Sequence, residues 1–236
     1  MNLEKYYKVS FKTYQNERLN KVNFHGKEIY PLYIQVGYDR KTIYFKSYFF
    51  DLLSKPQYVM RHYIGNRPPG INEVIAKEEK LISYIVKKHN DNFSLDLFKA
   101  EYAWYSRDLI NLLGNGFIDY LSVFFNDEGF NSLATMITLG GQYMQAISVW
   151  EGIQSALKPA LAQKVLTSAV YYAPPYLPVL MAANSKGERN ITTLSVFEWE
   201  SEAFQKLLDV LLKKKFEFYD LKNVKKSVEA LINTND

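Results

Sequence analysis

Hydrophobic and polar residues alternate along three short runs near the start of the chain, at residues 6–14, 30–37 and 41–50. Because successive side chains of a β-strand point to opposite faces of the sheet, this alternation predicts three strands. Gly37-Tyr38-Asp39-Arg40 lies between the last two runs and has the composition of a hairpin turn. One face is expected to be apolar, with Tyr7, Val9, Phe11, Thr13, Leu32, Ile34, Val36, Ile43, Phe45 and Phe49. The other is expected to carry Lys8, Ser10, Lys12, Tyr14, Tyr33, Gln35, Tyr44, Lys46 and Tyr48.

After the third run the pattern changes to helical spacing. Residues 54–72 are rich in proline and glycine, which is typical of a connector. A helix is expected to follow Asn72, with Val74, Leu81 and Ile85 inward and Lys77, Glu78, Lys80 and Lys87 in water. A second helix is expected from Ser94 to a stop at Gly114.

Further helices are predicted along the rest of the chain. The pattern from Ser132 to Leu157 is helical but interrupted at Gly140-Gly141, where paired glycines weaken the helix or let another backbone come close; a kink and a break are both open. The other expected helices are 117–125, 159–171, 201–212 and 222–231, with a short strand at 191–197. The fold class is therefore α+β: a small N-terminal three-stranded antiparallel sheet followed by a mainly helical domain. The expected divisions are an antiparallel β module at 1–55, a Pro/Gly-rich connector at 56–72 and a mainly α-helical domain at 73–236.

Composition narrows the class of protein. With 236 residues, 47% hydrophobic and 16% aromatic, the chain can bury a proper core. The absence of cysteine excludes disulfides, cysteine-ligated metals and thiol nucleophiles. The net charge of +4 permits contact with nucleic acid, but lysine outnumbers the arginine that usually reads bases. The longest apolar stretch, Tyr171–Ala183, is too short and too rich in proline to cross a bilayer, so no membrane contact and a cytoplasmic origin are expected.

A search for catalytic or metal-binding chemistry predicts none. The three histidines, His25, His62 and His89, have no metal-ligand spacing and are expected to be surface or structural residues. The acidic neighbours Glu78-Glu79 and Asp127-Glu128 could pair, but adjacent carboxylates are usually solvated. No catalytic, cofactor-binding or metal residue is predicted, and the chain is interpreted as a non-enzyme.

Two surfaces are the candidate contact sites. The first is the Lys and Tyr row of the predicted sheet, which suits a protein interface or nucleic acid; an ordinary solvated face is the alternative. The second is a basic cluster near the C-terminus, where a solubilising role is the alternative. The first comprises Lys8, Lys12, Tyr14, Tyr33, Tyr44, Lys46 and Tyr48. The second comprises Lys213, Lys214, Lys215, Lys222, Lys225 and Lys226.

The stretch "YPLYIQVGYDRKTIYFKSYFF" resembles the arm-type DNA-binding sheet that opens many phage and mobile-element tyrosine recombinases. The segments "EEKLISYIVKKHNDNFSLDLFKAEY", "FIDYLSVFF" and "YMQAISVWEGI" resemble the linker helix and SAM-like core-binding region of that family, so the resemblance covers roughly residues 6–160. The catalytic set of the family is absent. The three His-x-x-X tetrapeptides end in Glu28, Gly65 and Asn92 instead of arginine, and Arg189 is the only arginine after Arg107. The resemblance therefore implies a binding scaffold without strand-cleaving activity.

Two hypotheses follow. The first is a non-enzymatic structural or assembly protein of a tailed phage virion, a ring or adaptor of the neck or tail that contacts further copies of itself and portal or tail proteins. The frequent Asn, Lys, Ile and Tyr are typical of AT-rich genomes such as those of crAss-like phages. The second is a cytoplasmic DNA-binding accessory protein related to the N-terminal half of a tyrosine recombinase. A salt-dependent binding assay separates the two.

Overall fold

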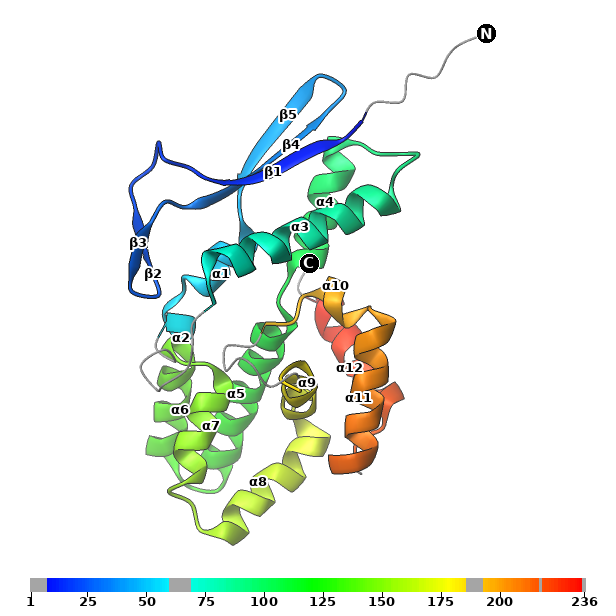
Figure 1. Cartoon of the computed structure of the whole chain (residues 1–236). Helices are drawn as coiled ribbons and strands as arrows, with labels where there is room; N and C mark the ends of the chain where they lie inside the picture. The colour runs from blue at the N-terminus through cyan, green and yellow to red at the C-terminus, as the bar shows by residue number, and fades with distance from the viewer. Residues whose placement is uncertain (1–7, 60–68, 186–192, 217, 235–236) are drawn as a thin grey trace. The chain divides into compact units, whose positions relative to one another are not determined.

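The computed structural model describes residues 8–59, 69–185, 193–216 and 218–234 of the chain. Antiparallel strands come first and a series of helices follows (Figure 1). The predicted α+β class is therefore confirmed.

The chain forms two compact units that interleave in sequence. We call the first the sheet unit; it combines residues 1–55 with 68–107. The second, the helical unit, combines residues 56–67 with 108–236. The predicted connector contributes helix α2 (Pro56–Val59) to the helical unit, and helix α3 already begins at Ile71.

The sheet unit is built on a three-stranded antiparallel sheet with the order β1-β4-β5. Its strands are β1 (Ser10–Gln15), β4 (Leu32–Tyr38) and β5 (Lys41–Lys46), which confirms the three predicted strands with shorter bounds. An additional hairpin, β2 (Val22–Phe24) with β3 (Lys27–Ile29), lies between β1 and β4 in sequence and was not expected.

Both hairpins turn through two residues with positive φ. Asp39 (φ 46°) and Arg40 (φ 60°) join β4 to β5, and His25 (φ 52°) and Gly26 (φ 83°) join β2 to β3. Positive φ at both central positions is the mark of a type I′ turn, whose twist matches that of the flanking strands. The predicted turn between the second and third runs is thus present, although neither of its central residues is glycine.

Helices cover one face of this sheet, as its apolar pattern requires. Leu32, Ile34 and Val36 of β4 are fully buried. Helices α3 (Ile71–Lys88) and α4 (Leu95–Ser106) pack on this side (Figure 1), and α4 presents Phe98 and Tyr102 to Phe45.

The third strand was predicted to run from 41 to 50, but β5 ends at Lys46. Ser47 leaves the sheet and caps helix α1 (Tyr48–Leu53), its hydroxyl accepting a hydrogen bond from the Phe50 amide at 3.0 Å. Phe49, Phe50, Leu52 and Leu53 are all buried. Consecutive apolar residues satisfy the spacing of a short buried helix, and the serine before them supplies the cap.

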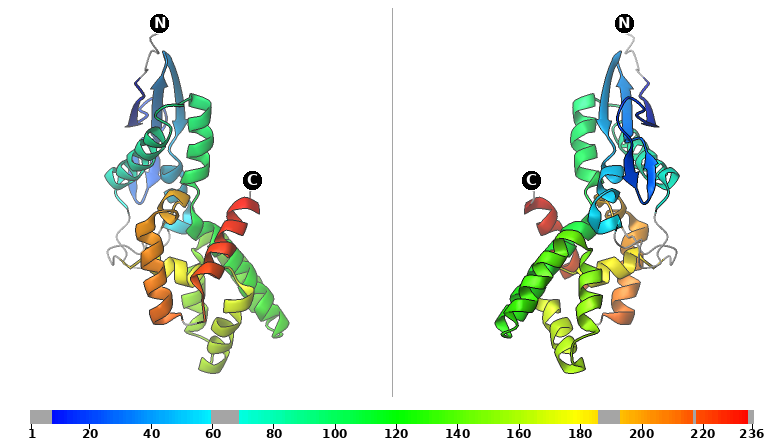
Figure 2. Two further views of the ribbon diagram at one scale, coloured as in Figure 1. Left: turned by 90° about the vertical axis from the view of Figure 1, so that its right-hand side faces the viewer. Right: turned by 90° about the vertical axis from the view of Figure 1, so that its left-hand side faces the viewer.

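The helical unit is organised around the long helix α5 (Leu109–Asp127), which pairs with α6 (Asn131–Tyr143) as an antiparallel hairpin (Figures 1 and 2). Helix α12 (Leu221–Thr234, red) leaves the end of α11 (Glu202–Lys215, orange) and contacts α5. The buried residues of α5 lie at 109–110, 113–114, 117–118, 120–121 and 124–125, and all of them except Gly114 have large side chains. The remaining helices are α7 (Ala146–Gln154), α8 (Pro159–Tyr172), α9 (Tyr176–Ala183) and α10 (Val196–Trp199).

One glycine-based helix boundary was predicted wrongly, and the interruption expected at Gly140-Gly141 lies after Tyr143. Helix α4 ends at Ser106, and α5 continues through Gly114 and Gly116; α6 likewise continues through Gly140-Gly141 to Tyr143. A Cβ on Gly116 would come within 2.7 Å of Pro174, and one on Gly141 within 2.8 Å of Ile118. These glycines allow close packing between neighbouring segments instead of ending a helix.

The short strand predicted at 191–197 is not formed by the residues that the structure describes there. Residues 191 and 192 lie outside the described part. Ser195 makes an isolated bridge with Asp108 and then caps α10, with its hydroxyl and amide both bonded to the Glu198 carboxylate at 2.8 Å. This capping box favours a helix start over a strand.

Candidate functional site

The register of the sheet brings most of the predicted Lys and Tyr row together. Residues directly opposite in an antiparallel pair share a face, so the pairings β1-β4 and β4-β5 define rows across the sheet. The first row is Tyr14, Tyr33 and Lys46, and the second is Lys12, Gln35 and Tyr44. We call this surface, completed by Ser10, Gly37 and Thr42, the Lys/Tyr face.

The Lys/Tyr face is open and partly ordered by its own contacts. Tyr44 is 60% exposed, while Tyr14 and Tyr33 are half-buried with ring centroids 6.5 Å apart. The Lys12 ammonium lies 5.2 Å from the Tyr14 ring centroid, within the range of a cation–π contact. Lys46 pairs with Asp51 of α1, so one of the two lysines on this face is already neutralised.

Two of the predicted residues are placed elsewhere. Tyr48 is the first residue of α1, not part of a strand, and its amide donates a hydrogen bond to the Tyr102 hydroxyl at 3.1 Å. It therefore does not join the Lys/Tyr face. Lys8 is exposed and precedes β1.

The six lysines of the second predicted surface belong to the helical unit. Lys213, Lys214 and Lys215 form the last turn of α11, where positive charge complements the helix dipole, and Lys213 pairs with Asp209 at 2.6 Å. Lys222, Lys225 and Lys226 lie in the first half of α12. The two predicted surfaces are therefore on different units.

A buried carboxylate in the sheet unit was missed. Glu78, expected in water, is fully buried. Its Oε1 accepts hydrogen bonds from the Ser47 hydroxyl and from the Phe49 amide at 3.2 Å. The Tyr102 hydroxyl donates to the carboxylate, at 2.8 Å from Oε2 and 3.0 Å from Oε1. Helical spacing could have predicted this burial, because position 78 lies on the same face of the helix as Val74, Leu81 and Ile85.

Burial governs the ionisation of this group. It raises the pKa of Glu78, and the hydrogen bonds from Ser47 and Tyr102 oppose the rise only in part. Burial and the neighbouring Glu78 likewise raise the pKa of Tyr102. The buried cluster of Glu78, Ser47 and Tyr102 links α3 and α4 to the N-terminus of α1, and we call such a cluster a structural tie.

The helical unit has a corresponding tie at Asp108, the N-cap of α5. Its Oδ2 accepts hydrogen bonds from the Tyr58 hydroxyl at 3.0 Å and from the Asn111 amide at 3.1 Å, and its Oδ1 accepts one from the Leu194 amide at 2.7 Å. Asp108 is buried, and two of its partners, Tyr58 and Leu194, come from distant segments. No sequence pattern identifies the two distant partners.

The histidines have structural positions. His25 is buried in the β2-β3 turn, with its ring 4.5 Å from that of Phe24. His89 caps the end of α3 and lies 3.2 Å from Glu101. His62 lies outside the described residues. Within the described part of the chain, no three His, Asp or Glu side chains gather as a metal site would require.

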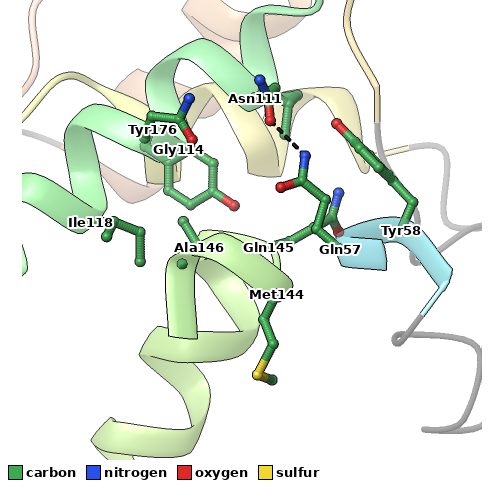
Figure 3. A pocket seen from close by; sticks show the side chains of 12 residues that line it. Gln57, Tyr58, Asn111, Gly114, Ile118, Met144, Gln145, Ala146 and Tyr176 are labelled. Carbon is green, nitrogen blue, oxygen red and sulfur yellow. Dashed lines mark hydrogen bonds between the residues drawn. The ribbon is translucent and has the colours of Figure 1, made fainter. Parts of the chain in front are cut away.

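The helical unit contains a small pocket and a wide groove. The pocket has a volume of 20 Å³, which is room for about one water molecule. Gln57 and Asn111 close one side of it through a 2.6 Å hydrogen bond, and Tyr176 faces the same space (Figure 3). The groove, between α5, α8 and α12, measures 860 Å³ and is mainly apolar.

Comparison of the chain with protein-family models, curated proteins and solved structures gave no match. The resemblance to tyrosine recombinases therefore stays a hypothesis. Among the described helices, none combines the length and the apolar character needed to cross a membrane.

Proposed function

We propose that this chain is a non-enzymatic assembly protein, a ring or adaptor component of the neck or tail of a tailed phage, that binds other protein chains through its Lys/Tyr face. The observation that carries the proposal is the open state of this face. Its opposite side is covered by α3 and α4, while Lys12 and Tyr44 remain exposed. Tyrosines on a rigid sheet offer a large contact area at low entropic cost.

The charges on the face favour a protein partner over nucleic acid. Lys46 is paired with Asp51, and Lys12 lies against the Tyr14 ring. The face carries no arginine, the residue best suited to bidentate phosphate contacts. Few unpaired cations therefore remain for a phosphate backbone.

The carboxylate clusters support a non-catalytic role. Glu78 is fully buried, and Asp108 is 1% exposed. A general acid or base must lie within hydrogen-bonding reach of a substrate. Both carboxylates instead hold backbone amides of the protein itself.

The direct test is quantitative mass spectrometry of purified phage particles, together with electron microscopy of the purified full-length protein. We expect the chain in the particles in stoichiometric amounts and closed rings in the images, either alone or after addition of a portal-type partner. A protein that is absent from particles and strictly monomeric would overturn the proposal.

DNA binding is the second candidate, and one observation favours it: a cation beside stacked aromatics, as at Lys12, Tyr14 and Tyr33, also suits nucleic acids. Titration of duplex DNA at several salt concentrations tests it. A steep loss of affinity with rising salt, reduced by Lys12→Gln, would support DNA binding. Absence of binding at low salt would exclude it.

A further inference from the structure

The wide groove of the helical unit leaves large side chains in water. Tyr171 and Tyr172 at the end of α8 are 72% and 79% exposed, and Val123 of α5 is 60% exposed. All three line the groove, whose floor includes Phe124 and Tyr120. Contiguous exposed aromatic and aliphatic groups mark interaction sites, and tyrosine is frequent among the residues that dominate binding energy.

The rim of the groove is acidic. Asp119 and Asp127 lie about two turns apart on α5, and both line the groove. Among the described residues neither forms an ion pair, whereas the adjacent Glu128 is neutralised by Lys164 at 2.6 Å. A suitable occupant therefore combines an apolar side chain with positive charge.

The end of α11 together with Phe218 has this chemistry. Phe218 is 77% exposed and follows the three exposed lysines that end α11. Phe216 and Tyr219 are half-buried, and their ring centroids lie 5.9 Å apart in an edge contact. Phe218 is left in solvent, outside the groove of its own chain.

We propose that the groove of one copy binds the end of α11 and Phe218 of a second copy, with Phe218 between Tyr172 and Val123 and with Lys214 and Lys215 facing Asp119 and Asp127. This inference rests on the proposed assembly function and specifies how copies join: one surface of each copy donates and a different surface accepts. Donor and acceptor surfaces differ, so the contact is heterologous, and a heterologous contact produces rings or filaments instead of closed dimers.

The test mixes two full-length variants in sedimentation velocity experiments. Phe218→Ser removes the donor surface, and Asp119→Lys/Asp127→Lys inverts the groove. Each variant alone is expected to lose the ring or filament that this contact builds and to keep only species held by the Lys/Tyr face. An equimolar mixture should restore one groove contact per pair of variants, but no ring or filament. Tyr143→Ser, which removes an aromatic of similar exposure on α6, is the control and should assemble like the wild type.

A ring or filament that survives both variants would overturn this inference while leaving the proposed function in place. Loss of the ring or filament in the groove variant alone would mean that another segment occupies the groove, and would also overturn it. If the wild type does not assemble, a labelled peptide of residues 211–221 is titrated against full-length Phe218→Ser protein. Binding that disappears with Asp119→Lys/Asp127→Lys or with serine at position 218 of the peptide supports the contact, and no binding contradicts it.

Discussion

The sheet unit and the helical unit build their open surfaces in different ways. The Lys/Tyr face comes from three strands within residues 10–46, where each side chain's place follows from strand alternation and register. The groove joins α5, α8 and α12, whose lining residues extend from Gly116 to Leu231. A surface whose residues follow the two-residue alternation of neighbouring strands can be predicted from sequence. A surface formed by helices that are distant in sequence requires the structure.

Each unit also depends on one buried carboxylate that collects donors from separate segments. Glu78 joins α3 to α1 and α4 in the sheet unit, and Asp108 joins α5 to α2 and to the segment before α10 in the helical unit. Weakening one tie should affect one surface and spare the other.

The largest effect is expected from Asp108→Ala. It leaves the Tyr58 hydroxyl and the Leu194 and Asn111 amides without their acceptor. We expect the free energy of unfolding of the helical unit to fall by about 3 to 4 kcal/mol, because unsatisfied buried donors retain their full desolvation cost. Hydrogen exchange followed by mass spectrometry should show loss of protection in α5.

Protection of β1, β4 and β5 should be retained in this variant. Asn126→Ala, an exposed change on the same helix, is the control and should alter neither unit. Equal loss of protection in both units would show that they do not act separately.

Tyr102→Phe is the corresponding change in the sheet unit. It removes a hydroxyl that donates to Glu78 and accepts from the Tyr48 amide. A loss of about 2 kcal/mol in urea unfolding is expected, since two hydrogen bonds of a buried network disappear. Tyr105→Phe, which removes an acceptor of the partly exposed Lys88, should cost less; an equal or greater cost would contradict the tie at Glu78.

Glu78→Gln should change how stability depends on pH. Burial raises the pKa of Glu78 in the folded protein above the ordinary value of 4.5. At a pH between the pKa of Glu78 in the unfolded chain, 4.5, and its raised pKa in the folded protein, Glu78 is ionised only in the unfolded chain. The free energy of unfolding of the wild type therefore falls as pH rises above 4.5. Below that value the contribution is fully present.

Glu78→Gln cannot ionise at position 78 and should not lose stability in this way. The difference in the free energy of unfolding between Glu78→Gln and the wild type should therefore increase with pH. Urea unfolding at a series of pH values measures it, with the exposed Glu79→Gln as control. Parallel pH profiles for the wild type and Glu78→Gln would contradict the role of the buried carboxyl.

The smallest expected effect is a gain. Arg40 has a φ of 60° in the turn that fixes the β4-β5 register. Glycine adopts this conformation without a Cβ penalty, so Arg40→Gly should raise the melting temperature, with a gain of about 1 kcal/mol. Lys41→Gly, at the first position of β5, should lower stability instead; a loss in Arg40→Gly would show that the side chain has another role.

Periodicity predicted the strands because one face of each is buried and the other is not. The same reasoning failed at Tyr48, where a capping serine begins a helix within an apolar run. It also failed at Gly114, since a glycine that permits close packing and one that ends a helix look alike in sequence. Glu78 could have been found from its position on the buried stripe of α3, but its partners Ser47 and Tyr102 depend on tertiary packing.

The most direct measurement of the central claim is the assembly state of the full-length protein with a disrupted Lys/Tyr face. The double variant Lys12→Glu/Tyr44→Ser changes two exposed side chains, and Lys27→Glu on β3 is a matched exposed control. We expect sedimentation velocity to show a larger species for the wild type and the control than for the double variant, which keeps only the groove contact, with thermal unfolding unchanged. A double variant that assembles as the wild type does would contradict the assignment of this face as a protein contact surface.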